Sequence, residues 1–449
     1  MRSVNDRAAA GGPVVYLMSR DQRVEGNWAL LYAQEKALER KVPLVVVFNL
    51  FLMPARTTLR QYDFMLKGLE EVATELATLQ IPFYLLEGKV EDVMSDFVKK
   101  HHVGELVLDV SPLRYSVERR KRLAAVLPCA VTEVDAHNII PVWQASDKEE
   151  FAAYTFRPKV HRALGSFLTE FPKVKKHTYA WDKKVPVIAW QKVLKQLPLD
   201  AAVGPTAIIP GIKAAKKVLK EFIATKLERY HEDRNDPTLG GVSGLSAYLH
   251  FGQISAQKVA YEIAKLHDVH KEAHDAFLEE LIVRRELADN YCFYNTDYDR
   301  VEGAHVWAKK TLLEHKNDPR EHIYTKEQLE SASTHDDLWN AMQRQMVLEG
   351  KMHGWCRMYW AKKILEWTKN PQQAIDVALY LNDKYELDGL DPNGIVGVMW
   401  SICGVHDRAW NERNIFGKIR YMNYAGAKRK FDIKAYIERY GSAEKTLFS

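Results

Sequence analysis

Cysteine is scarce in this chain, and its spacing limits the chemistry that it can support. The four cysteines among 449 residues lie at positions 129, 292, 356 and 403, and no two of them form a C-x-x-C pair. This pattern supports neither a disulfide framework nor a thiolate zinc site, and it favours a reducing compartment.

Long apolar runs are also missing. No uninterrupted stretch approaches the ~20 apolar residues that span a bilayer, and the first twelve residues lack the apolar centre of a signal peptide. We therefore expect a soluble intracellular protein, in the cytoplasm, the nucleus or an organelle, with no membrane partner.

Neither sign of charge is in large excess. Lysine and arginine number 64 against 59 aspartate and glutamate, which leaves a net charge of +5. That surplus is too small to indicate a nucleic-acid binder by itself. The length and the 47% hydrophobic content fit an ordinary globular protein of two or three domains.

The N-terminal third alternates short apolar runs with segments of helical periodicity. The apolar runs are about five residues long and lie at 14–18, 44–48, 83–86, 106–110 and 130–134. This alternation predicts repeated βαβ units and a doubly wound α/β domain with a five-stranded parallel sheet over residues 1–144. Residues 19–23 (SRDQR) follow the first run in place of G-x-G-x-x-G, so a standard dinucleotide site is not supported.

The rest of the chain changes in character twice. Residues 145–210 are rich in lysine and proline and read as a connector with one helix near 160–171. From residue 211 to 449 helical periodicity dominates and no strand is evident, so the second domain is predicted to be all-α.

Two turn-rich segments are candidate ligand sites. Residues 237–253 (PTLGGVSGLSAYLHFGQ) place glycines and serines before an apolar helix that Ser246 could cap, and the segment is either a plain capped helix or a phosphate site. Residues 382–394 are acidic, but their spacing fails the calcium loop, so we expect no metal site there. A polar loop that contacts the edge of a heterocycle fits equally well.

Tryptophan and basic residues are concentrated near the C-terminus. Six of the eleven tryptophans lie between 339 and 410, and Trp360 and Trp367 share a predicted helix face ~10 Å apart, which suits either electron hopping or a buried stripe. Seven basic residues and one acid lie between Arg408 and Lys430, with Trp410, Phe416, Tyr421 and Tyr424 among them. This stretch is either a solvated face or a nucleic-acid surface.

Together these segments resemble the photolyase/cryptochrome superfamily, and specifically the class II cyclobutane pyrimidine dimer photolyases. The resemblance covers nearly the whole chain and rests on residues 18–23 (MSRDQR), 27–30 (NWAL), 134–138 (VDAHN), 245–255 (LSAYLHFGQIS), 350–354 (GKMHG), 357–363 (RMYWAKK) and 417–422 (GKIRYM). It implies a light-driven carbon–carbon lyase in which excited, reduced anionic FAD gives an electron to a pyrimidine dimer in double-stranded DNA and then recovers it. Some relatives also hold a second, antenna chromophore in the α/β domain.

The resemblance also implies roles for individual residues. FAD contacts fall to Tyr230, Arg234, Ser243, Gly244, Leu245, Ser246, Asn382, and the pair of Arg357 and Asp388 beside the isoalloxazine. A cation and polar groups there would stabilise the reduced anion, whereas without a flavin the pair is an ordinary buried ion pair. Glu280 is similar to the acid that bonds the flipped dimer, and Met358 and Trp400 to walls of its pocket. DNA contacts fall to Arg284, Arg408, Trp410 and Arg420, and a tryptophan electron relay to Trp339, Trp360 and Trp367.

Several positions depart from the family pattern, and two other functions were weighed. The departures are Ala247, Arg284, Asp337, Met342 and Leu390. A cryptochrome-like blue-light receptor commonly carries a long signalling tail, but only 19 residues follow Lys430. A non-catalytic nucleic-acid-binding flavoprotein would not need Glu280, Met358 and the relay together. We therefore predict a repair enzyme that acts as a monomer.

Overall fold

The structure is a computed structural model that describes residues 1–52 and 58–441. The last eight of the residues that follow Lys430 lie outside these ranges.

The N-terminal part is built on one sheet with the strand order β1-β6-β5-β2-β3-β4. Five strands run parallel and coincide with the five apolar runs: β2 (Val14–Met18), β3 (Leu44–Leu50), β4 (Phe83–Glu87), β5 (Glu105–Asp109) and β6 (Ala130–Val134). The predicted doubly wound parallel sheet is confirmed. A sixth strand, β1 (Arg2–Ser3), pairs antiparallel with β6. The prediction of five strands missed it because two residues are too few to show a strand period.

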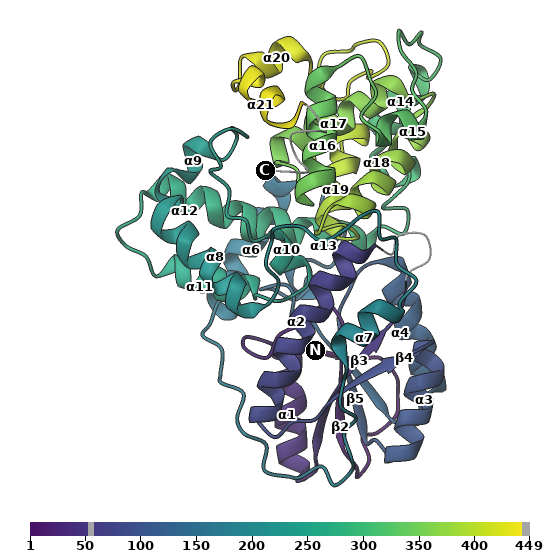
Figure 1. The fold of residues 1–449 in the computed structure, drawn as a ribbon, viewed down its shortest axis with the longest axis vertical. Helices are drawn as coiled ribbons and strands as arrows, with labels where there is room; N and C mark the ends of the chain where they lie inside the picture. Colours follow the sequence, from purple (N-terminus) through teal and green to yellow (C-terminus); the bar gives the residue numbers. More distant parts are fainter. Residues whose placement is uncertain (53–57, 442–449) are drawn as a thin grey trace.

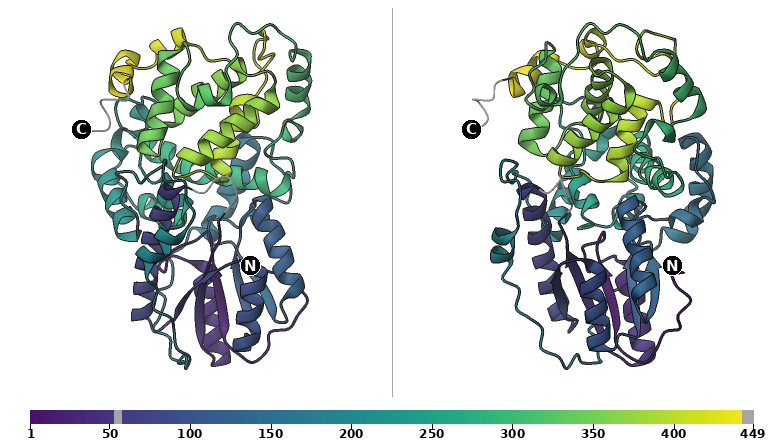
Figure 2. Two further views of the ribbon diagram at one scale, coloured as in Figure 1. Left: turned by 45° about the vertical axis from the view of Figure 1, so that its right-hand side comes forward. Right: turned by 90° about the vertical axis from the view of Figure 1, so that its right-hand side faces the viewer.

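Helices cover both faces of this sheet (Figure 2). Along β2, Val14, Tyr16 and Met18 pack with α1 (Trp28–Arg40) and α2 (Leu59–Thr78), while Val15 and Leu17 pack with α3 (Val90–His101) and α4 (Arg114–Val126). Successive strand residues point to opposite faces, so burial on both sides requires the continuous apolar runs seen in the sequence.

The segment after the sheet contains more helix than the sequence indicated. It holds α5 (Val142–Ala145), α6 (Ala153–Phe167) and α7 (Trp190–Gln196). The helix expected near 160–171 therefore begins earlier, at Ala153, and ends earlier, at Phe167. Helix α7 was missed because it is short, and it is held by packing of Trp190, Val193 and Leu194 against the α1–α2 side of the sheet.

The C-terminal part is helical, as predicted, and no strand occurs in its described residues, 211–441. Its elements are α8 (Ile212–Thr225), η1 (Leu227–Arg229), α9 (Tyr230–Asp233), α10 (Ser246–His250), α11 (Ala256–Ala264), α12 (Lys271–Leu278), η2 (Glu279–Arg284), α13 (Arg285–Tyr294), η3 (Val301–Gly303), α14 (Val306–Glu314), α15 (Lys326–Glu330), α16 (Asp337–Glu349), α17 (Gly354–Trp367), α18 (Pro371–Tyr385), α19 (Pro392–Cys403), α20 (Tyr424–Lys428) and α21 (Ile433–Tyr440).

Helix α2 joins the two parts, because it reaches from the sheet layer into the helical part (Figure 1). At its start, the buried Arg60 guanidinium donates to the carbonyl oxygens of Met346 and Val347 in α16 and of Tyr385 at the end of α18. Burial lowers the pKa of Arg60 to about 10. Carbonyl groups at helix C-termini attract cations, so Arg60 links the ends of α16 and α18 to α2, which packs on the sheet.

Candidate active site

Arg357 and Asp388, predicted as an ion pair from distant parts of the chain, do meet. Arg357 lies on α17, and its Nη2 is 2.7 Å from Asp388 Oδ1 in the loop before α19. Burial opposes ionisation of Asp388, but the guanidinium and a hydrogen bond from Ser246 outweigh it and hold the pKa of Asp388 below its usual value. The sequence did not reveal a third member, Glu386, whose Oε2 lies 2.8 Å from the same Arg357 nitrogen.

The glycine- and serine-rich loop reaches this pair through Ser246, because the Ser246 side chain bonds to Asp388. The prediction that Ser246 caps the following helix is wrong: Leu245 holds the cap position of α10, no side chain caps it, and Ser246 is the first helical residue. Gly244 adopts a φ of +74°, where a side chain would be strained, so the tight turn of the loop depends on this glycine.

Tyr230 and Arg234 lie side by side, and Arg234 also contacts Glu280. The Arg234 guanidinium lies 5.8 Å from the Tyr230 ring centroid, and its Nη1 donates to Glu280 Oε1 at 2.5 Å. Glu280 lies on the π-helical turn η2. One residue predicted for the cofactor and one predicted for the substrate are thus directly bonded.

Asn382 is buried near the end of α18, where its Nδ2 donates to Asp383 Oδ1 at 3.0 Å. The neighbouring helix α19 passes so close that a Cβ at Gly394 would lie 2.9 Å from Asn382 Nδ2. Gly394 therefore permits the approach that holds Asn382 in place. Leu390, one of the departures from the family pattern, adopts a φ of +58° in the same loop.

The three tryptophans predicted as a relay form one connected group. Trp360 and Trp367 lie on α17 as predicted, and Trp339 on α16 contacts both, with ring centroids 6.3 Å from Trp360 and 5.7 Å from Trp367. All three side chains are almost completely buried. The contacts place Trp339 between the other two, an order that the sequence could not supply.

The group extends to a tyrosine that the sequence did not reveal. The half-buried Tyr324 ring lies 5.5 Å from Trp367, and its hydroxyl is 2.7 Å from His335 Nδ1. Tyr324 lies in the loop before α15, where no periodic pattern marks a functional residue.

The basic and aromatic residues after α19 form a stack, and three of the predicted DNA contacts lie in it. The Arg420 guanidinium lies 4.8 Å from the Trp410 ring and 5.6 Å from the Trp400 ring, and Arg408 lies 5.0 Å from Trp410. A buried cation missed in the sequence, Lys362 Nζ, lies 4.7 Å from Trp400. Burial lowers the pKa of Lys362 to about 7.

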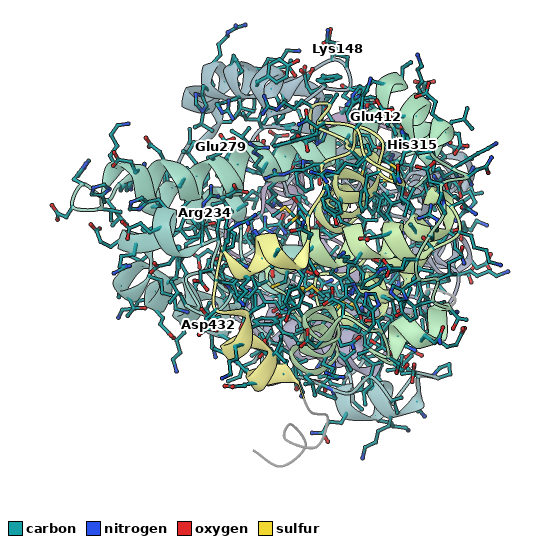
Figure 3. All side chains as sticks on the ribbon, turned by 90° about the horizontal axis from the view of Figure 1, so that it is seen from above. Lys148, Arg234, Glu279, His315, Glu412 and Asp432 are labelled. Carbon is teal, nitrogen blue, oxygen red and sulfur yellow. The ribbon has the colours of Figure 1, made fainter. Side chains whose placement is uncertain are left out.

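Three other predicted positions lie apart from this stack. Phe416, grouped with the stacking aromatics, is buried in the helical core, so that part of the prediction is wrong. Arg284 pairs with Glu279 on η2 at 3.2 Å, and Met358 packs half-buried against the core of α16–α19. Figure 3 looks down on this end of the molecule, with Arg234 and Glu279 on one side and His315 and Glu412 on the other.

A cavity of about 530 Å³ opens at the carboxyl ends of the parallel strands. Its wall includes Leu17, Leu108, Tyr62 and Arg119 from the sheet part and Leu390 from the helical part. Strands β5 and β3 flank β2 on opposite sides, and such a reversal of strand order is where open α/β sheets usually bind ligands. The sequence indicated the sheet but not this cavity.

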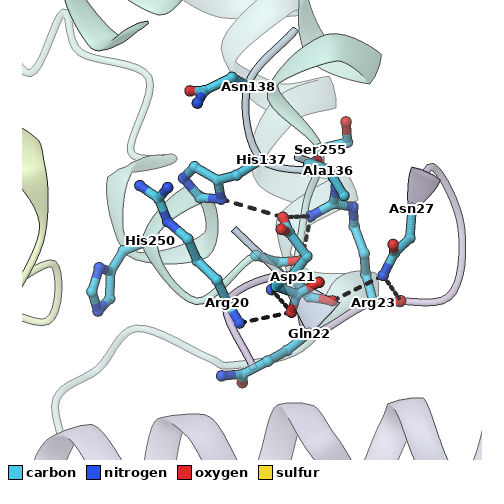
Figure 4. A network of polar contacts seen from close by, with 12 residues as sticks. Arg20, Asp21, Gln22, Arg23, Asn27, Ala136, His137, Asn138, His250 and Ser255 are labelled. Carbon is cyan, nitrogen blue, oxygen red and sulfur yellow. Dashed lines mark hydrogen bonds and ion pairs between the residues drawn. The ribbon is translucent and has the colours of Figure 1, made fainter. Parts of the chain in front are cut away.

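The segment SRDQR, which follows β2 where a dinucleotide-binding domain has a glycine-rich loop, forms a buried polar network. Arg20 donates to both carboxylate oxygens of Asp289 on α13, at 2.7 and 2.8 Å, and Arg23 pairs with Asp21 at 2.6 Å. His137 Nδ1 lies 3.2 Å from the same Asp21 (Figure 4). This buried network joins the sheet to the helical part.

Two kinds of feature do not occur in the described residues. Within residues 1–52 and 58–441, no group of three or more His, Cys, Asp or Glu side chains is arranged to hold a metal ion. None of the described helices combines the length and the apolar composition needed to cross a membrane.

Comparison with known proteins identifies the family. The family model for DNA photolyase matches residues 14–176. A deoxyribodipyrimidine photo-lyase of Potorous tridactylus is 51% identical over 433 residues, covering 96% of this chain and 81% of that protein. One of Arabidopsis thaliana is 49% identical over 441 residues, covering 95% and 88%.

A solved structure agrees at the level of fold. The photolyase of Sulfolobus tokodaii, determined with two FAD molecules, superposes with a TM-score of 0.70 at 17% identity and covers 97% of this chain and 91% of that one. With about half of its residues identical to those of the Potorous and Arabidopsis enzymes over nearly its whole length, this chain belongs to the DNA photolyase family.

Proposed function

We propose that this protein is a class II photolyase that repairs cyclobutane pyrimidine dimers in DNA with light. The observation that carries the proposal is near-full-length identity of about half to proteins named deoxyribodipyrimidine photo-lyase. A blue-light receptor without repair activity is the weaker alternative, because these relatives are named as lyases.

Membership of the family implies FAD, and the side chains present suit it. Hydroxyl groups of Ser243 and Ser246 and the cation of Arg234 can bind a diphosphate, and Arg357 with Asp388 offers both a donor and an acceptor to a ring edge. Tyr230, Gly244, Leu245 and Asn382 complete the proposed site. Bound FAD would supply the photoexcited electron that splits the dimer.

On the substrate side, the chain would receive the extruded dimer and fill the gap that it leaves. Glu280 would bond the dimer between walls formed by Met358 and Trp400. Trp410, which is partly exposed, would stack in the gap, and Arg408, Arg420 and Arg284 would pair with phosphates. Only Oε1 of Glu280 is bonded to Arg234, so Oε2 can accept a hydrogen bond from the dimer while this ion pair persists.

The tryptophans would carry electrons from the surface toward the cofactor in the order Trp367, Trp339, Trp360. The contacts of Trp339 with both partners support this order. Because Trp367 is only 2% exposed, the surface end of the relay would be Tyr324, whose proton can move to His335.

The remaining parts of the proposal concern the N-terminal domain and the organisation of the chain. A second, antenna chromophore would bind in the 530 Å³ cavity, where a largely apolar wall includes the cation of Arg119. We divide the chain into an α/β domain (1–144), a connector (145–210) and a catalytic domain (211–449), and propose a monomer in the cytoplasm, the nucleus or an organelle.

One experiment separates repair from light reception. Purified protein would be scanned for flavin absorption, reduced, and incubated with dimer-containing DNA in blue light and in the dark. Loss of dimers only in light supports repair. Flavin absorption with intact dimers would establish the receptor instead.

A further inference from the structure

Glu386 is a buried carboxyl group whose position is not explained by packing. Its side chain is fully shielded from solvent, Oε1 accepts a hydrogen bond from the Met352 backbone N–H at 2.9 Å, and Oε2 lies 2.8 Å from Arg357 Nη2. Asp388 Oδ1 lies 2.7 Å from the same nitrogen. Two carboxyl groups therefore share one nitrogen of one guanidinium.

Two carboxyl groups beside one cation cannot both ionise easily, and their surroundings shift their pKa values in opposite directions. Burial raises the pKa of Glu386 to about 8, against the attraction of Arg357. Asp388 remains ionised, because Arg357 and Ser246 lower its pKa. At neutral pH the proton therefore resides on Glu386, and the Arg357–Asp388 pair is electrically balanced.

The groups that face Glu386 come from every element packed against it. They are Arg357 on α17, Lys351 in the loop between α16 and α17, Arg60 at the start of α2, and Asp388 and Tyr385 beside it in the chain. Burial lowers the pKa of Lys351.

We propose that Glu386, wherever the pH leaves it ionised, binds a proton from solvent when a flavin beside Arg357 is reduced, so that the net charge around Arg357 stays constant. This inference rests on the proposed function, which places FAD beside Arg357. The reductant supplies electrons to the flavin, one water-derived proton joins a carboxylate oxygen of Glu386, and no other bond changes. Negative charge near a carboxylate favours its protonated form. Glu386 is thus a positioning residue, because in its protonated form it no longer adds a second negative charge beside Arg357.

The test measures proton uptake during electrochemical reduction of the FAD-loaded protein, with a pH-indicator dye in weak buffer. At about pH 9 the wild type should take up as much as about one proton more per flavin than Glu386→Gln. Below about pH 7 the two should take up the same number, because Glu386 is already protonated there. Glutamine keeps the acceptor for the Met352 N–H, so the fold is preserved. Equal uptake at the higher pH would overturn the inference.

A spectroscopic readout and a matched control make the assignment specific. The infrared difference spectrum of the wild type should gain the C=O band of a protonated carboxyl on reduction at the higher pH, and Glu386→Gln should lack it. The control is Glu286→Gln, because burial also raises the pKa of Glu286 to about 8, while its side chain bonds to the Ile139 backbone rather than to Arg357. This control should behave as the wild type, and loss of the band in it would reassign the proton to Glu286.

One further variant separates failure of this inference from failure of the proposed function. In Arg357→Met, flavin absorption and midpoint potential should both shift if FAD lies beside Arg357. If neither shifts while FAD stays bound, the proposed placement of FAD is wrong. If both shift but Glu386→Gln takes up protons as the wild type does, only the role of Glu386 fails.

Discussion

Arg234 and Glu280 form a direct ion pair, with Nη1 2.5 Å from Oε1, although the two residues lie 46 positions apart. The pair connects the side chain proposed to bind the FAD diphosphate with the one proposed to bind the dimer. Because the Glu280 side chain is still 42% exposed, the pair can open without a large cost in burial.

The first prediction follows from this pair. Glu280→Ala should keep FAD bound but lower the repair yield per absorbed photon several-fold at saturating DNA, because the dimer loses its carboxyl partner. The neighbouring Glu279→Ala is the control at saturating DNA, since Glu279 pairs with Arg157 at 2.7 Å and with Arg284 at 3.2 Å rather than with Arg234. An unchanged repair quantum yield in Glu280→Ala would show that this carboxyl does not act on the dimer.

The loop at Ser246 should be intolerant of negative charge. Ser246→Asp removes the hydroxyl bonded to Asp388 and puts a second carboxylate beside it, close to the proposed diphosphate. We expect most of the FAD to be lost on purification, measured as the ratio of flavin to protein absorbance. Ser333→Asp, on the exposed turn before α16, should retain it. Full FAD content in a folded Ser246→Asp protein would contradict the proposed site.

Electron transfer to the oxidised flavin should slow when either Trp339 or Trp360 is replaced. Trp360→Phe and Trp339→Phe should slow photoreduction of oxidised flavin by at least about tenfold, because phenylalanine preserves most of the packing but is much harder to oxidise. Repair by chemically reduced enzyme should persist.

The control for the relay is Trp355→Phe. Trp355 is also buried on α17, but its ring stacks on Tyr359 and meets Phe431 edge to face rather than contacting the relay. Transient absorption after a light pulse would compare the three variants. Photoreduction of Trp339→Phe at the wild-type rate would show that Trp339 is not the middle member.

The stack of Arg420 on Trp410 should determine affinity rather than chemistry. Trp410→Ala and Arg420→Ala should weaken binding to dimer-containing duplex, and the arginine change should also reduce the slope of log K against log salt by roughly one. Salt-titrated binding would measure both. Lys434→Ala, on the exposed face of α21, should leave binding unchanged. If Arg420→Ala bound with an undiminished salt slope, Arg420 would not contact a phosphate.

His137 lies in the buried network that joins the sheet to the helical part, and it should make the protein less stable at acidic pH. Burial, together with Arg20 and Arg285, lowers the pKa of His137 to about 4. The unfolded chain binds this proton near its ordinary pKa of about 6.5, so protons favour the unfolded state as the pH falls below that value.

Replacing this histidine should therefore remove part of the acid sensitivity. Between about pH 7.5 and pH 5, the loss in free energy of unfolding should be about 2 kcal/mol smaller in His137→Gln than in the wild type. Urea unfolding followed by tryptophan fluorescence at both pH values would measure the difference. An equal loss in the two proteins would show that His137 has the same pKa in the native and unfolded states.

The sequence by itself determined the elements of this protein. Strands buried on both faces need uninterrupted apolar runs, so the parallel sheet could be predicted from the sequence. The seven-residue spacing likewise placed Trp360 and Trp367 on one helix face. The cofactor and DNA candidates came from a resemblance to the family. The structure brings Arg357 to Asp388, the pair that the resemblance implies. It also brings Trp410 to Arg420, while the roles of these two residues on DNA stay predictions.

Only the tertiary structure decided which side chains share a partner. Arg234 bonds to Glu280, Glu386 shares a nitrogen of Arg357 with Asp388, Trp339 lies between two other tryptophans, and Ser246 bonds to Asp388 instead of capping its helix. Periodicity reports the local face on which a residue lies, whereas these contacts depend on how distant elements cross, which no short window of sequence contains. The same limit hid the cavity at the strand ends and the Tyr324–His335 contact.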